Sequence, residues 1–163
     1  MIIQFKKYRD KQSTLTCIRS DGTRTWDKLQ VDFELHDLAH FAIETELGFT
    51  NAFYGLLAKG YNIQDFSLPV EQRPQALISK NLPVESLQTE HIANLLLIDH
   101  FQKNIGSDFI DQLKGMLKED GLAFPEILTQ ERLEKINNSF EELISKWNAL
   151  EEEGMLELSF NLI

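Results

Sequence analysis

The chain has 163 residues, a length typical of a single domain that buries about 70% of its unfolded surface. Its 26 acidic and 16 basic residues give a net charge of −10, and such a field repels polyanions, so we expect neither nucleic acid nor an anionic membrane as a partner. The single cysteine, Cys17, excludes an internal disulfide and a cysteine-based zinc site.

The N-terminal part predicts strands, because apolar and polar side chains alternate in residues 3–6, 14–18 and 23–26. Asp21-Gly22 separates the second and third of these segments, and an Asp-Gly loop between β-prone segments is a strong hairpin signal. A two-residue loop there places Cys17 opposite Trp26 and Ser20 opposite Thr23. The middle of a strand suits Cys17 as a buried, unreactive thiol better than as a nucleophile.

Helical periodicity begins at Phe33 and continues to Gly154, with one long interruption in the proline-containing loop from Ser67 to Pro83. Thr50, Ser107 and Thr129 are expected N-caps, and Gly48, Gly60 and Gly121 mark expected helix ends. The predicted helices are Leu35–Leu47, Thr50–Lys59, Glu85–Asn104, Ser107–Gly121, and a last one from Thr129 to before Gly154.

The last helix carries a continuous apolar stripe from Leu133 to Leu150 with alternating spacings of three and four residues. The stripe either packs on the sheet of its own chain or forms the seam of a homodimer. After it, residues 155–163 alternate again, so we expect a half-buried C-terminal strand.

This order of strands, helices and one further strand predicts a single α+β domain over residues 1–163. We expect about four antiparallel strands, three N-terminal and one C-terminal, packed with about five helices. The final strand is expected to pair with the N-terminal hairpin.

One polar cluster indicates a candidate functional site, in the segment HDLAHFAIE from His36 to Glu44. On a helix, His36, Asp37, His40 and Glu44 fall within one arc of about 100°, and the rest of the circumference is mostly apolar. An ordinary solvated face would carry Lys, Arg or Gln, and this one carries none. It therefore predicts a metal site, an acid–base or ligand site without metal, or a structural polar face.

The metal interpretation rests on two histidines four residues apart, which can offer two imidazole nitrogens to one ion, as in the metalloprotease motif HExxH. Asp37 stands where that motif has its glutamate and is one methylene shorter. Glu44 lies about 12 Å along the helix axis from His36, so it can share or orient His40 only. Asp37 and Glu44 are therefore candidates for a general base or for support of the ligands, and zinc or another divalent metal is the expected cofactor.

A third ligand has to come from another element. His91 lies on the apolar stripe of its helix, whereas His100 projects to the more polar side. His91 is therefore the expected third ligand, in a three-histidine site with an open position for water. The alternative is that His91 is a hydrogen-bonded core residue.

The segments HDLAHFAIE and FYGLLAKG, preceded by a hairpin and Trp26, resemble a group of small bacterial proteins of unassigned function. The resemblance covers roughly residues 1–65. It implies a similar fold and a bacterial source, and it transfers no activity.

The N-terminal segment has no apolar signal region, and the longest apolar run, near Ile92–Ile98, is far too short to span a membrane. A cytoplasmic location is therefore expected. Two functions remain open: a metal-binding domain, with His36, His40 and His91 as ligands, or a non-enzymatic homodimer that serves interaction or structure. Whether the His36–Glu44 cluster is buried distinguishes the two functions. A buried cluster needs ligands or partners, whereas an exposed cluster does not. Whether the protein binds a small-molecule ligand, and which one, stays open.

Overall fold

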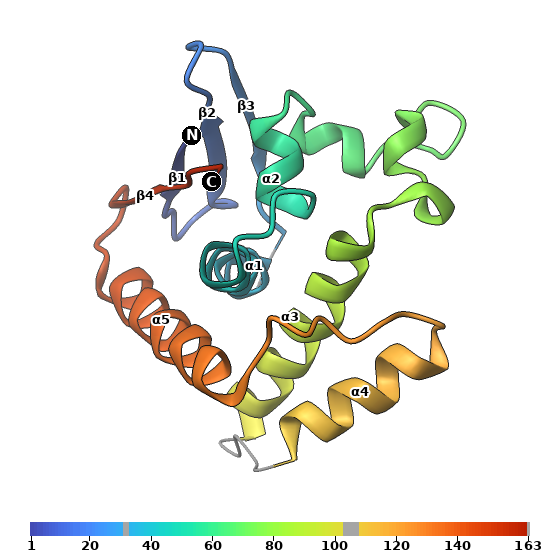
Figure 1. Cartoon of the computed structure of the whole chain (residues 1–163). Helices are drawn as coiled ribbons and strands as arrows, with labels where there is room; N and C mark the ends of the chain where they lie inside the picture. The colour runs from blue at the N-terminus through green and yellow to red at the C-terminus, as the bar shows by residue number, and fades with distance from the viewer. Residues whose placement is uncertain (31–32, 103–107, 163) are drawn as a thin grey trace.

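The computed structural model describes residues 1–30, 33–102 and 108–162, and it shows an α+β domain (Figure 1). The four strands form one antiparallel sheet in the order β3-β2-β1-β4. This confirms the predicted class, including the pairing of the C-terminal strand with the N-terminal hairpin. The strands are β1 (Ile2–Lys6), β2 (Thr14–Ile18), β3 (Arg24–Lys28) and β4 (Met155–Ser159).

Five α-helices connect β3 to β4: α1 (Phe33–Leu47), α2 (Phe53–Ala58), α3 (Val84–Gln102), α4 (Phe109–Glu119) and α5 (Gln130–Ala149). Helix α1 lies at the centre, with the sheet, α2, α3 and α5 around it (Figure 1). Its residues from Asp37 to Glu44 are all buried, because neighbours cover the helix on nearly every side. The inner face of the sheet, with Ile3, Phe5, Leu15 and Cys17, completes the same core.

The hairpin register differs by one residue from the prediction. Thr16, not Cys17, pairs with Trp26, and Cys17 pairs with Thr25. The loop has three residues, since Arg19 N donates to Thr23 O and Gly22 adopts a φ of +83°, which glycine tolerates without strain. Trp26 consequently lies on the outer face, while Cys17 is fully buried and its burial raises the thiol pKa to about 12.

Two helix starts also differ from the expected positions. Thr50 does not cap α2, which begins at Phe53 after Ala52. The backbone N–H groups of Thr50 and Asn51 instead donate to the Glu85 carboxylate of α3. The expected end of α3 at Asn104 and the expected cap Ser107 lie outside the described residues, whereas Thr129 caps α5 as predicted.

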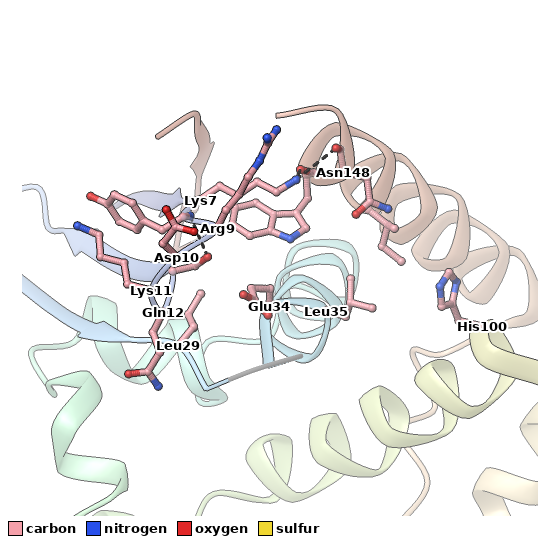
Figure 2. Close-up of a pocket in the computed structure, with 14 residues that line it drawn as sticks. Lys7, Arg9, Asp10, Lys11, Gln12, Leu29, Glu34, Leu35, His100 and Asn148 are labelled. Carbon is pink, nitrogen blue, oxygen red and sulfur yellow. Dashed lines mark hydrogen bonds between the residues drawn. The ribbon is translucent and has the colours of Figure 1, made fainter. Parts of the chain in front are cut away.

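The apolar stripe of α5 packs inside its own chain. Its members Leu133, Ile136, Phe140, Leu143 and Trp147 are all buried. The Lys7 ammonium donates to the Trp147 and Asn148 carbonyls at the helix C-terminus (Figure 2). The stripe is therefore a core feature, and the homodimer stays a prediction that would need another surface.

Across the described residues, none of the helices combines the length and the apolar character that crossing a membrane requires.

Candidate metal centre

The polar side chains of α1 face the interior of the domain. The side chains of His40 and Glu44 are 3% and 0% exposed, and Asp37 is also buried. The predicted polar face is thus enclosed by the neighbouring helices. Buried polar groups of this kind require hydrogen bonds, ions or ligands as partners.

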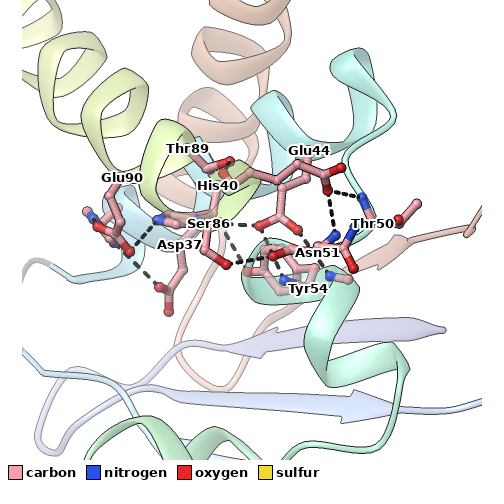
Figure 3. Close-up of polar contacts among 12 residues, drawn as sticks. Asp37, His40, Glu44, Thr50, Asn51, Tyr54, Ser86, Thr89 and Glu90 are labelled. Carbon is pink, nitrogen blue, oxygen red and sulfur yellow. Dashed lines mark hydrogen bonds and ion pairs between the residues drawn. The ribbon is translucent and has the colours of Figure 1, made fainter. Parts of the chain in front are cut away.

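Both histidines direct a ring nitrogen at one carboxylate, Glu90 of α3. Figure 3 shows His40 beside this carboxylate. His40 Nε2 lies 3.3 Å from Glu90 Oε1, and His36 Nε2 lies 3.4 Å from Glu90 Oε2. One ligand atom from each of the three residues lies within 4.8 Å of the others. A tetrahedral zinc site with bonds of about 2.0 Å has ligand atoms about 3.3 Å apart. The two distances from the histidines to Glu90 match this spacing, and the group as a whole is close enough for its three side chains to reach one ion.

His40 Nε2 is the most informative atom of the group. It is buried, and among the described residues it has no hydrogen-bond partner, although it lies within ion-pair distance of Glu90. Leaving a buried nitrogen without a hydrogen bond costs about 1–3 kcal/mol. A metal ion bound between His40 and Glu90 would satisfy this atom.

The other nitrogen of each ring faces a second carboxylate. His40 Nδ1 lies 3.3 Å from Glu44 Oε1, and His36 Nδ1 lies 3.8 Å from Asp37 Oδ1. A carboxylate behind a histidine fixes the ring orientation and leaves Nε2 free for a metal, which is the common arrangement in metalloproteins.

Glu44 also ties the cluster to α2. Its carboxylate accepts hydrogen bonds from the backbone N–H groups of Tyr54 and Gly55, at 3.2 and 3.1 Å. A negative charge is favourable there because the first N–H groups of a helix have no partner within the helix. Glu44 therefore lies behind His40, the position of a supporting group rather than of a base, and it does not line the pocket described below.

The charges of the cluster reinforce one another. Burial lowers the pKa of His40, but Glu44 and Glu90 outweigh it and raise that pKa to about 10. Burial works against the Glu90 carboxylate too, yet the two histidines hold its pKa well below its usual range. Burial raises the pKa of Glu44, so the buried His40–Glu44 pair retains a proton when no metal is bound.

A pocket of about 270 Å³, called here the histidine pocket, adjoins these side chains. His36, His40, Asp37 and Glu90 line it together with the end of β3 and the 3-10 helix η1 (Ile63–Phe66). Asp37 is the predicted base candidate that faces this space. Phe33, Phe53 and Phe66 supply aromatic walls, and Phe53 makes an edge contact with the His40 ring.

His91, the predicted third ligand, lies elsewhere. Its Nε2 is 2.9 Å from the Asp120 carboxylate after α4, and it is not part of the group around His36 and His40. Glu90, one residue earlier, takes the place expected of His91. Ser86 and Ala93, small residues one turn away on either side of Glu90, are buried, but this pattern within α3 does not say which element covers that face.

A larger pocket, of about 600 Å³, lies between the β1–β2 loop and α5 (Figure 2). Lys7, Arg9 and Lys11 make it resemble an anion site. Lys7 is bonded to the end of α5, Arg9 pairs with Glu151 and Glu152, and Lys11 lies over the Tyr8 ring. The cations of this larger pocket thus already have partners, and we assign the candidate functional site to the histidine pocket.

No family model, curated protein or solved structure matches the chain. The functional interpretation therefore rests on the geometry of the residues described above.

Proposed function

We propose that this protein binds one divalent transition metal, of the zinc class, through His36, His40 and Glu90. The observation that supports this most strongly is the buried His40 Nε2 atom, which lacks a hydrogen bond and shares Glu90 with His36. Two imidazoles and a carboxylate form a donor set that suits zinc and neighbouring transition metals.

The arrangement favours a catalytic rather than a purely structural site. Three protein ligands leave a fourth position of a tetrahedral ion open, and the histidine pocket lies next to the ligands. A water bound there would be acidified by the metal, and Asp37 is the pocket-lining carboxylate that could accept its proton. The reaction class that these parts support is hydrolysis of a polar bond.

A second candidate is a purely structural charge cluster. The ion pairs from Glu90 to both histidines and the raised pKa of His40 support it, because protonated histidines could hold α1 and α3 together without metal. In that case the protein would be a non-enzymatic interaction module, and metal would not bind.

Zinc titration of protein purified without an affinity tag or chelator, against a competing chromogenic chelator, distinguishes the two. We expect one zinc per chain, and a loss of affinity of more than about 100-fold in His40→Ala, which removes a ligand. His91→Ala is the matched control, because it removes a histidine outside the group, and it should bind zinc normally. Absence of zinc binding by the unmodified protein would favour the structural cluster.

A further inference from the structure

The end of β3 forms one wall of the histidine pocket, and its backbone has an unusual position there. Asp27, Lys28, Leu29 and Gln30 all line the pocket. In the sheet order β3-β2-β1-β4, β3 is an edge strand, so one row of its backbone groups faces away from β2.

The ladder shows which residues face outward. Leu29 N donates to Ser13 O, and Arg19 N donates to Thr23 O, so odd-numbered residues of β3 bond to β2. Arg24, Trp26 and Lys28 therefore direct their backbone N–H and C=O groups to the free edge. Consistent with this, the Trp26 carbonyl accepts a hydrogen bond from the Gln64 side chain of η1.

Helix η1 covers only part of this edge. Gln64 reaches Trp26 from η1, which packs beside β3. At Lys28 the N–H is held by the neighbouring Asp27 carboxylate, at 2.7 Å, and this is a local bond that an incoming carbonyl can replace. Among residues 1–30, 33–102 and 108–162, no other element bonds to the Lys28 backbone, so the edge that η1 leaves open begins at the pocket.

The side chains around the pocket set the chemistry of a ligand. Asp27, Asp37 and Glu90 are acidic, whereas Lys28 belongs to the exposed series of β3 residues and alternation turns its side chain to the outer face of the sheet. Glu90 is paired with His36 and His40. Asp27 and Asp37 are therefore the acidic groups left in the pocket, and a neutral backbone amide suits them better than an anion does. Phe53 and Phe66 offer an apolar wall to a side chain, and their rings are 5.1 Å apart.

We propose that an extended peptide pairs with β3 at Lys28, places an apolar side chain against Phe53 and Phe66, and brings its backbone amide to the metal centre. This rests on the proposed function for the hydrolysis of that amide, in which water adds to the carbonyl carbon, the C–N bond breaks, and the water's protons pass to the amine and the new carboxyl group. Edge pairing supplies affinity through the main chain and selectivity through the side-chain pocket. Binding itself needs β3 and does not need the metal.

The test uses the blocked peptide acetyl-Ala-Phe-Ala-amide and its analogues N-methylated at each backbone amide in turn, titrated into zinc-loaded and metal-free protein by NMR. The parent peptide should shift the Lys28 amide signal, and one N-methyl analogue should bind about fivefold to tenfold more weakly, since one hydrogen bond is lost. Lys28→Pro, which places a ring on the free edge, should abolish that difference. Arg24→Pro is the matched control, because Arg24 also faces outward but does not line the pocket.

If all analogues bind equally, or if Lys28→Pro keeps the discrimination, the pairing at β3 is wrong. Absence of peptide binding at millimolar concentration in both metal states overturns it too. Failure of zinc binding alone, with peptide discrimination intact in the metal-free protein, would overturn the proposed metal function and leave the peptide site standing.

Discussion

His40 lies between two carboxylates, and these contacts determine the orientation and the charge of its ring. Glu44 contacts Nδ1 from behind, and Glu90 lies 3.3 Å from Nε2 in front. Glu44 is buried completely, and within the described part of the chain its charge is compensated by His40 and by the N–H groups of α2. The two residues therefore act as one unit, in which Glu44 sets the orientation of the ring.

Glu44→Gln should weaken both the fold and the metal site. Removing one partner of a buried pair costs about 3 kcal/mol of the free energy of unfolding, and loss of a carboxylate behind a ligand raises the zinc Kd about 10- to 100-fold. Urea denaturation and zinc titration measure the two effects. Glu46→Gln on the same helix, whose carboxylate is outside the cluster, should change neither, and equal effects in both variants would contradict the assigned role of Glu44.

The metal-free protein should lose stability when the pH rises. The pKa of His40 is raised from 6.5 to about 10 in the fold, so its contribution is complete below pH 6.5 and is lost as the pH approaches 10. The pKa of Glu90 is lowered from 4.5, so its contribution is present above pH 4.5 and is lost as the pH falls below that value. Together, the shifts of His40 and Glu90 stabilise the fold most between pH 4.5 and 6.5.

Thermal melts of the metal-free wild type and of His40→Gln, measured from pH 4.5 to pH 10, test this pH dependence. The difference in Tm should be largest near pH 6 and should shrink toward pH 10, because only the wild type has the charge to lose. A difference that does not change with pH would show that His40 is not protonated in the fold.

At the scale of elements, the site depends on how closely α2 approaches α1. Gly55 N lies 3.1 Å from Glu44 Oε2, and a Cβ atom at Gly55 would lie 2.3 Å from the Thr50 carbonyl oxygen. Only glycine fits this contact between the turn before α2 and the helix itself. Gly115 in α4, by contrast, has open space where a Cβ would be.

Gly55→Ala and Gly115→Ala should therefore have opposite effects. The first forces α2 away from Thr50 and costs about 3 kcal/mol, with weaker zinc binding as a consequence of the displaced Glu44 partners. The second removes backbone freedom from the unfolded chain and gains about 0.5–1 kcal/mol. Denaturant unfolding of both variants is the measurement, and a tolerated Gly55→Ala would contradict the described packing of α2.

For the whole molecule, the sequence predicted the class and the sheet pairing, because alternation and helical periodicity are local signals. The hairpin register escaped prediction, since Asp21-Gly22 occurs in both two- and three-residue loops and only the backbone pairing of Arg19 with Thr23 distinguishes them. Two of the three candidate ligands were local, because His36 and His40 share one helix. Glu90 was missed because the rotation of α3 about its axis is set by packing against α1, which no pattern within α3 contains.

The homodimer remains a prediction, and the structure removes one of the two surfaces considered for its interface. The α5 stripe is buried within the chain, so the edges of the sheet at β3 and β4 are the places where two copies could pair. Sedimentation equilibrium at micromolar concentration should show a dimer. A monomer over the whole concentration range would contradict it.

Zinc K-edge X-ray absorption of the zinc-loaded protein tests the proposed ligand set most directly. The structure predicts a four-coordinate zinc with scattering from two imidazoles and with oxygen ligands for the remaining positions. The Glu90→Gln variant should keep both imidazoles while the zinc Kd rises. A spectrum without imidazole scattering, or with three imidazoles, would contradict a centre built from His36, His40 and Glu90.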